Sequence, residues 1–487
     1  MENTKITKAL SEDWVAFWLG LTIFALGLLA FMGIETLGWA IKTNVWTDLG
    51  KALSPASATF KNLPSIASLF LTYVFLLVFM LLASRALGAN AKKFVVGFTL
   101  VFWISYGCWI TGHYAHIAAT HNQFDKFGIT WSLNLTGEAG FIVALLAGLV
   151  VGNFFPNLVS VMSEATRPEL YVKTAIVILG AALGAKAAEH LGMGQAILFR
   201  GLCASIEVYL IDWAVVYLVA RTLFKFNREW AVPLASGISI CGVSAAIATG
   251  AAIRARPVVP IMVSSLVVIF AVVELIILPF MSRELLWMHP MVAGDWMGLA
   301  VKTDGAAIAS GTIVDSLVRA KAAAAGTIYE PGWIAMPAVT SKIFIDMFIG
   351  IWAFVLAVVW CAKIECKEAV KASIIWERFP KFVIGYFLTF ICMLFVALSS
   401  KGLLKQAQMA TGQMDNFRGM FFIMTFFTIG VISNFRKLWE EGFGKLAAVY
   451  FLCLFGFIIW VGLGISWIFF SGMEPPIISG PSLIPGS

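Results

Sequence analysis

Two stretches of this sequence place glycine, hydroxyl, thiol and charged residues in apolar surroundings, where they could bind a polar solute. The first, residues 231–255, reads AVPLASGISICGVSAAIATGAAIRA, and the second, residues 299–313, reads LAVKTDGAAIASGTI. The two share a short similarity, because AAIATG at residues 245–250 is echoed by AAIASG at residues 306–311. A helix that only crosses a membrane needs no such residues at its centre. We therefore interpret both stretches as parts of one binding site.

Backbone chemistry explains why interrupted helices mark a site. In hydrocarbon every N–H and C=O group must be paired, so a membrane helix is broken only where protein or a water-filled cavity covers the freed groups. Paired, glycine-interrupted segments are typical of transporters, in which half-helix N-termini present N–H groups to an anion. The alternative is close helix packing, which glycine, alanine and serine also favour. The paired occurrence and the embedded charges favour broken helices over residues 231–253 and 294–317.

Three charged residues lie where hydrocarbon is expected. Lys302 and Lys342 fit neither a loop nor the end of a span, and a charge at mid-membrane costs about 3 kcal/mol unless it is paired or lines a wet cavity. We expect both lysines to supply positive charge to an anion, and Asp304 to bind a coupling proton or sodium ion. The alternative is a structural ion pair, of Lys342 with Asp346 at i,i+4 or of Lys302 with Asp304 across a break. The residues predicted to bind substrate are Ser236, Gly237, Ser239, Cys241, Gly242, Ser244, Lys302, Thr303, Gly305 and Lys342.

Composition defines the elements that must position these residues. The chain is 60% hydrophobic and 13% charged, whereas soluble domains are about 25% charged. Apolar runs of about 20 residues, enough to cross roughly 30 Å of hydrocarbon, recur from Trp14 to Phe470. The sequence predicts an all-α polytopic membrane protein with about 13 spans. We divide it into a three-span N-terminal extension with outward-facing loops (1–137), an inverted-repeat transport core (138–470) and a short outward-facing tail (471–487).

The distribution of basic residues predicts the orientation of the chain. The net charge is +7, but Lys and Arg are spread among short loops, so no nucleic-acid partner is expected. Loops on the amino-terminal side carry more of them, which places the N-terminus in the cytoplasm and the C-terminus outside. The seven cysteines lie mostly within spans and none forms a CxxC pair, so free thiols are expected.

Three features recur at a constant offset of 250 residues, the separation of Gly180 and Gly430. An odd number of predicted spans separates the matching features, so they run in opposite directions, as an inverted repeat requires. The matching features are Leu179-Gly180 with Ile429-Gly430, Lys186 with Arg436, and Gly192–Gly194 with Gly442–Gly444.

Several short motifs between about Glu138 and Phe470 resemble the sulfate exporter family of bacterial inner-membrane proteins. The specific part is SGISICGVSAAIA at residues 236–248, with its ICGxSA pattern. The resemblance implies two inverted halves similar to the bile-acid sodium symporter superfamily, in which discontinuous helices cross at the binding site, and it implies anion export. Where that family tends to have His-Asp-Thr, this chain has Thr303-Asp304-Gly305, so the aspartate is retained and an imidazole is missing. The other matching motifs are Gly148 with Gly152, Val177–Gly180, Phe379–Tyr386 and Ile429–Gly430.

The leading hypothesis is a secondary active transporter in the bacterial inner (plasma) membrane. It would export a small anion, sulfate or an organosulfonate, by alternating access around the two broken helices. The alternatives are a cation-coupled importer of an organic acid, driven by H⁺ or Na⁺, and a membrane sensor or scaffold that does not transport. An enzyme is disfavoured, because no histidine lies near Ser239, Cys241 and Ser244 to act as a base.

The partners expected are the anionic solute, the lipid bilayer and a coupling proton or sodium ion. No GxxxxGK[ST] phosphate-binding loop occurs in the sequence, and no cofactor or metal is expected. The oligomeric state is left open, a homodimer included.

Overall fold

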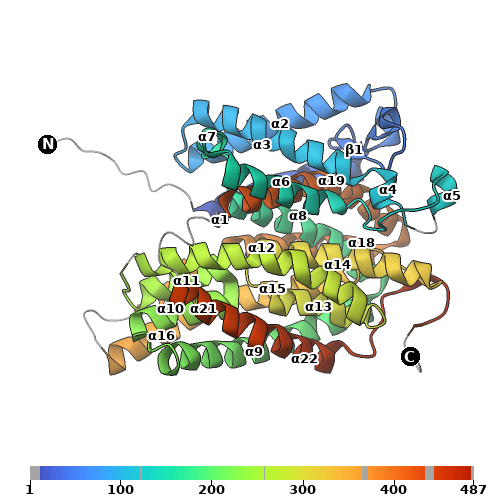
Figure 1. Cartoon of the computed structure of the whole chain (residues 1–487). Helices are drawn as coiled ribbons and strands as arrows, with labels where there is room; N and C mark the ends of the chain where they lie inside the picture. Colours follow the sequence, from blue (N-terminus) through green and yellow to red (C-terminus); the bar gives the residue numbers. More distant parts are fainter. Residues whose placement is uncertain (1–10, 121–122, 257, 365–370, 434–443, 484–487) are drawn as a thin grey trace. The chain divides into compact units, whose positions relative to one another are not determined.

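The computed structural model describes residues 11–120, 123–256, 258–364, 371–433 and 444–483. Within these ranges the strands form only two small antiparallel pairs, β1 (Ile41–Thr43) with β2 (Leu53–Pro55) and β3 (Ile328–Tyr329) with β4 (Ile477–Ser479). Most of the remaining described residues are helical (Figure 1). The predicted all-α class is therefore confirmed.

The apolar helices are numerous enough for a polytopic membrane protein. In the described part of the chain, 11 helices are long and apolar enough to cross a membrane, or up to 12 if the bent pair α6 (Ala139–Phe154) and α7 (Pro156–Met162) forms one span. The pair α13 (Pro290–Ala300) and α14 (Asp304–Ala324), which contains the second predicted broken segment, is not among them. If that pair were added to the upper count of 12, the total would equal the predicted number of about 13 spans. The number of spans stays a prediction.

Contacts divide the chain into two compact units, and each unit is assembled from separate parts of the sequence. The first unit comprises residues 1–111, 143–189 and 381–431, and the second comprises residues 112–142, 190–380 and 432–487. The division predicted from the sequence, into an extension, a core and a tail, is not tested by these contacts and stays a prediction.

The first unit is built around α8 (Pro168–Glu189), which packs against α1 (Glu12–Leu28) and α18 (Lys381–Ser399). Gly180 and Gly184 of α8 directly face backbone atoms of α18, so a side chain at either position would push the two helices apart. Thr389 of α18 donates a hydrogen bond of 2.7 Å to the Val177 carbonyl oxygen across the same contact. The other helices of this unit are α2 (Ser65–Ala86), α3 (Ala91–Gly112), α6, α7, α19 (Lys401–Ile432) and the 3₁₀ helices η1 (Leu29–Met32), η2 (Leu49–Lys51) and η3 (Ala58–Phe60).

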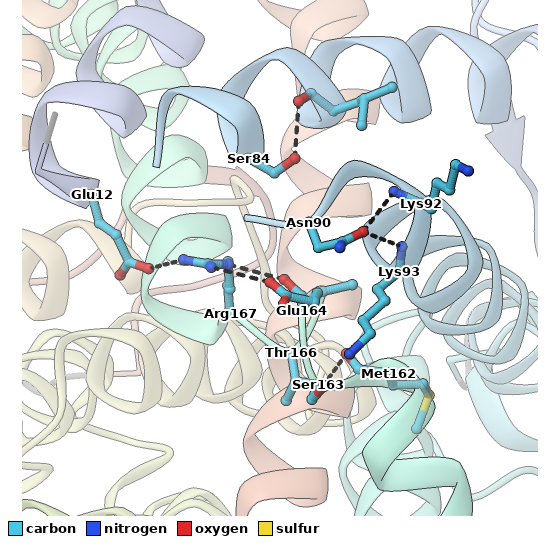
Figure 2. Close-up of polar contacts among 12 residues, drawn as sticks. Glu12, Ser84, Asn90, Lys92, Lys93, Met162, Ser163, Glu164, Thr166 and Arg167 are labelled. Carbon is cyan, nitrogen blue, oxygen red and sulfur yellow. Dashed lines mark hydrogen bonds and ion pairs between the residues drawn. The ribbon is translucent and has the colours of Figure 1, made fainter. Parts of the chain in front are cut away.

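Ion pairs join the start of α1 to the start of α8. The Arg167 guanidinium donates to the Glu12 carboxylate at 2.9 Å and lies 3.9 Å from the Glu164 carboxylate (Figure 2). The Lys173 ammonium lies 2.9 Å from Asp13. At the start of α3, the Asn90 side chain accepts hydrogen bonds from the two backbone N–H groups of residues 92 and 93 (Figure 2). The first predicted span therefore packs within the same unit as α8.

Gly180 and Gly430, which are mates in the predicted repeat, both lie at close helix contacts of the first unit. Gly430 of α19 faces backbone atoms of α6 at Gly148. Two further members of the predicted repeat, Arg436 and Gly442, lie outside the described residues. The inverted repeat stays a prediction.

The second unit holds both of the stretches predicted to be broken. α13 packs against α14, α15 (Ala335–Met347) and α22 (Ile459–Phe470), and α14 also packs against α12 (Val258–Leu286) and α15 (Figure 1). The other helices of this unit are α4 (Ala115–Ala118), α5 (Phe124–Phe127), α9 (Leu191–Thr222), α10 (Arg228–Ser236), η5 (Gly237–Cys241), α11 (Gly242–Ala252), α16 (Ile349–Lys363), α17 (Ser373–Arg378), α21 (Gly444–Cys453) and η6 (Leu454–Ile458).

The two interruptions differ in kind. The second stretch is broken as predicted: α13 ends at Ala300, the backbone is extended at Val301 and Thr303, and α14 begins at Asp304. The first stretch runs through the π-helical segment η5 and then leaves helical geometry at Cys241 (φ −138°, ψ 81°) and Gly242 (φ 13°, ψ −93°), so the predicted break at Gly242 is found. Gly237 keeps helical dihedral angles, so the chain is not broken there. The predicted breaks at Gly237 and Gly242 are the first residue of that π segment and the first residue after it.

The cysteines depart from expectation at one position. Cys108, Cys203, Cys241, Cys392 and Cys453 are free, whereas Cys361 is disulfide-bonded. The expectation of free thiols is therefore wrong for Cys361, which lies near the end of α16 and of a candidate span. Cys366 lies outside the described residues.

Candidate functional site

The two interruptions meet at one point of the second unit. The backbone N–H of Gly242 donates to the carbonyl oxygen of Lys302 at 2.9 Å. A Cβ at Gly242 would lie 3.0 Å from the Thr303 methyl group and would overlap Val267, so only glycine fits without rearrangement. Because α11 begins at Gly242 and α14 at Asp304, the N-terminal ends of both helices lie at this contact.

Lys302 lies in the link between α13 and α14 and is almost fully buried. Its ammonium group lies 3.1 Å from the Asp212 carboxylate of α9 and donates to the Leu299 carbonyl oxygen. Its backbone N–H donates to the Glu274 carboxylate of α12 at 3.1 Å. The ion-pair partner of Lys302 is therefore Asp212, and the alternative pairing with Asp304 is not observed.

Lys342 reaches the meeting point from α15 and has 0% exposure. Its ammonium group donates to the Ile240 carbonyl oxygen of η5 at 2.8 Å and to the Lys302 carbonyl oxygen at 3.2 Å. It also lies 3.7 Å from the Asp304 carboxylate. Asp346, the partner expected at i,i+4, is buried and acts on Lys342 electrostatically. Lys342 thus links both interruptions, which the sequence did not indicate.

Asp304 is buried at the first position of α14, where a carboxylate is favoured by the helix dipole. It accepts a hydrogen bond from the Cys241 thiol. Ligand atoms of Cys241, Asp304 and Asp346 all lie within 4.8 Å of one another, a spacing that could hold a metal ion. The Lys342 ammonium beside Asp304 would repel such an ion, so the chemistry here is that of an internal ion pair.

The remaining predicted residues have mixed roles. Ser236 accepts a hydrogen bond of 3.0 Å from the Trp213 indole, and Thr303 caps α14 by accepting from the Ala306 N–H at 3.3 Å. Ser239 is buried, and its hydroxyl has no hydrogen-bond partner among the described residues. Of the other three predicted residues, Gly237 and Gly305 are buried and Ser244 is half-buried.

A buried carboxylate near the site was missed by the sequence analysis. Asp295 of α13 has 0% exposure and accepts hydrogen bonds from Ser341 of α15 at 2.5 Å and Ser466 of α22 at 2.7 Å. Its position within the apolar run MVAGDWMG was the available signal. Asp212 and Glu274 also lie within apolar runs of the sequence, but nothing in their spacing points to Lys302.

Among the described residues of this unit, buried acids outnumber buried lysines. Asp212 pairs with Lys302 and Asp304 lies beside Lys342, and charge buried in apolar surroundings is retained where it pairs or serves a pathway. The buried acids around the meeting point and along α13 are Asp212, Glu274, Asp295, Asp304 and Asp346.

The fold and the site define a polytopic α-helical membrane protein in which two interrupted helices meet at buried charges. The chain belongs to the family described as Conserved hypothetical protein 698, whose family model matches residues 129–449. The family relationship expected from the motifs is therefore confirmed, and the match contains both interruptions.

Two of three relatives in other organisms are named as membrane proteins. The chain is 42% identical to a UPF0324 membrane protein of Nitrosomonas europaea, over 96% of this chain and 98% of that protein. A UPF0324 membrane protein of Nitratidesulfovibrio vulgaris is 27% identical over 82% of this chain and 63% of its own length. An uncharacterized protein of Archaeoglobus fulgidus is 49% identical over 29% of this chain and 89% of its own length. No solved structure matches the chain.

Proposed function

We propose that this protein is a secondary active transporter that exports a small anion by alternating access around α10–α11 and α13–α14. The observation that carries the proposal is the hydrogen bond of 2.9 Å between the Gly242 N–H and the Lys302 carbonyl, which joins the N-terminal ends of α11 and α14. A helix N-terminus carries roughly half a positive charge and exposes N–H groups that bind anions. Meeting points of interrupted helices are where secondary transporters bind their substrates.

The buried lysines support an anionic substrate. Lys302 and Lys342 both lie at the meeting point, and each is balanced by a carboxylate, Asp212 and Asp304 respectively. An anion such as sulfate or an organosulfonate would compete with these carboxylates for the ammonium groups. Protonation of Asp304 would remove one competitor from the start of α14, so proton binding and anion binding would favour each other.

The excess of buried acids favours a second candidate from the same class. Among its described residues the unit has more buried acidic side chains than buried lysines. Bound H⁺ or Na⁺ would neutralise those that are ionised, as in an importer of an organic acid driven by H⁺ or Na⁺. This candidate differs from the first in its driving gradient and direction. A sensor or scaffold would bind a solute without moving it.

The experiment is a flux assay in proteoliposomes with imposed gradients. Vesicles loaded with unlabelled sulfate or methanesulfonate are diluted into labelled anion, and counterflow is measured with and without pH and Na⁺ gradients. Counterflow that requires the protein supports the anion transporter. Uptake of an organic acid driven by a cation gradient supports the importer, and anion binding without any flux overturns both. Liposomes without protein are the control.

We further propose a bacterial inner-membrane location, with the N-terminus in the cytoplasm and the C-terminus outside. The distribution of Lys and Arg among the loops supports this orientation. Reporter fusions that fold on only one side of the membrane, placed after the last residue and within the 42–64 loop, test it. Activity of both fusions on the cytoplasmic side would contradict the orientation.

A further inference from the structure

We infer that the ammonium group of Lys342 is a tethered cation, which occupies the position that a coupling sodium ion would otherwise take between the two interrupted helices. The inference deepens the proposed function, because it defines which cation the transport site uses. It predicts that the protein needs no sodium ion and that removing Lys342 creates a binding site for a small monovalent cation.

Three oxygen atoms from different elements converge on this ammonium group. The Ile240 carbonyl of η5 lies at 2.8 Å and the Lys302 carbonyl at 3.2 Å, and the Asp304 carboxylate lies at 3.7 Å. A lysine ammonium has three N–H donors and no acceptor. It donates hydrogen bonds to the two carbonyl oxygens and has the Asp304 carboxylate as its counter-ion. Lys342 itself belongs to α15, a helix that contributes neither interruption.

The two carbonyl oxygens both lie at the interruptions, and the Lys302 oxygen also accepts the hydrogen bond from the Gly242 N–H. Ile240 lies in the π-helical segment, and Lys302 lies in the extended link, where regular helical hydrogen bonds are lost. In transporters with interrupted helices, carbonyl groups at such points coordinate sodium ions or interact with protons. Here the same oxygens receive an ammonium group that is covalently part of the protein.

The acidic groups around this position favour a cation there. Asp346 and Glu274 also act electrostatically on Lys342, as does Asp304. A second cation about 4 Å from the ammonium would be repelled by roughly 4 kcal/mol at an effective dielectric constant of 20. Sodium is therefore excluded while Lys342 is present. Without Lys342, a buried carboxylate and two carbonyl groups lack a cation, and a small ion can supply it.

The experiment measures thermal unfolding of the purified full-length protein in detergent, in equal concentrations of NaCl, KCl, NH₄Cl and choline chloride. Choline is too large for the position and controls for ionic strength. Wild-type protein should unfold at the same temperature in all four salts. In choline chloride, Lys342→Ala should have a lower unfolding midpoint than the wild-type protein. At least one small cation should raise the midpoint of Lys342→Ala by about 2–4 °C relative to choline chloride. Lys321→Ala, which removes a partly exposed lysine of α14, is the matched control and should show no such selectivity.

Two results would overturn the inference. One is stabilisation of the wild-type protein by NaCl relative to choline chloride, and the other is a folded Lys342→Ala protein whose midpoint is the same in all four salts. If Lys342→Ala yields no folded protein in any salt, the wild-type comparison decides, since equal midpoints support the inference and sodium stabilisation contradicts it. The experiment measures neither anion binding nor flux, so its outcome can be interpreted even if the proposed transport function is wrong.

Discussion

Gly242 and Lys302 are joined through their backbones, with the N–H of Gly242 donating to the Lys302 carbonyl oxygen at 2.9 Å. The same oxygen accepts a hydrogen bond from the Lys342 ammonium at 3.2 Å. One carbonyl group in the link between α13 and α14 therefore receives donors from α11 and from α15. Any displacement of this link changes the surroundings of both partners, which is the kind of connection that alternating access requires.

Replacing Gly242 by valine should separate the two interruptions. The new side chain would meet the Thr303 methyl group and Val267, and such overpacking costs about 1–3 kcal/mol. We expect a lower unfolding temperature and loss of anion counterflow. Gly464→Ala in α22 is the control, because a Cβ there meets no atom within 4 Å. Wild-type counterflow by Gly242→Val would show that the contact is not needed for transport.

Removing one partner of the Lys302–Asp212 pair should destabilise the protein strongly. Lys302→Met leaves the Asp212 carboxylate buried without its cation, which costs about 3–5 kcal/mol. Asp212→Leu should cost a similar amount, and the double variant should cost much less than the sum. The measurement is the free energy of unfolding of all four proteins in a double-mutant cycle. Additive losses would mean that the two residues do not interact.

Asp304→Asn should uncouple anion flux from the pH gradient. The substitution keeps the size of the side chain and removes the negative charge that competes with the anion at the start of α14. Anion-induced thermal shifts should be retained or enlarged, while acceleration of counterflow by a pH gradient should disappear. Glu284→Gln, at an exposed acid of α12, is the control. A pH-gradient response equal to that of the wild type would exclude Asp304 as the coupling group.

The hydroxyl groups of Ser341 and Ser466, which donate hydrogen bonds to Asp295, should stabilise the folded protein. Ser341→Ala and Ser466→Ala each remove one donor from a buried carboxylate, and an unsatisfied buried group costs about 1–3 kcal/mol. Unfolding of the single variants should therefore begin at lower temperature, whereas Ser265→Ala, at an exposed serine of α12, should stay within about 0.5 kcal/mol. Equal stability of all three variants would argue against these hydrogen bonds.

The sequence by itself determined the class of protein and predicted where the candidate site lies. Apolar runs and the requirement that every backbone group in hydrocarbon be paired can be evaluated along the chain without knowing the fold. They sufficed to predict the helical membrane protein and to single out residues 231–253 and 294–317, and they marked Lys302, Asp304 and Lys342 as unusual.

Only the tertiary structure decided the partners of these charges. Lys302 and Asp212 are separated by 90 residues, and Lys342 and Ile240 by 102 residues, so neither pairing leaves a periodic pattern in the sequence. The π segment that precedes the break at Gly242 and the burial of Asp295 between two serines likewise depend on which helices pack together. The physical reason is that the need to pair each backbone N–H and C=O group can be evaluated from residues close in the sequence. The partner of a buried charge, in contrast, belongs to a distant segment that packing brings within a few ångströms.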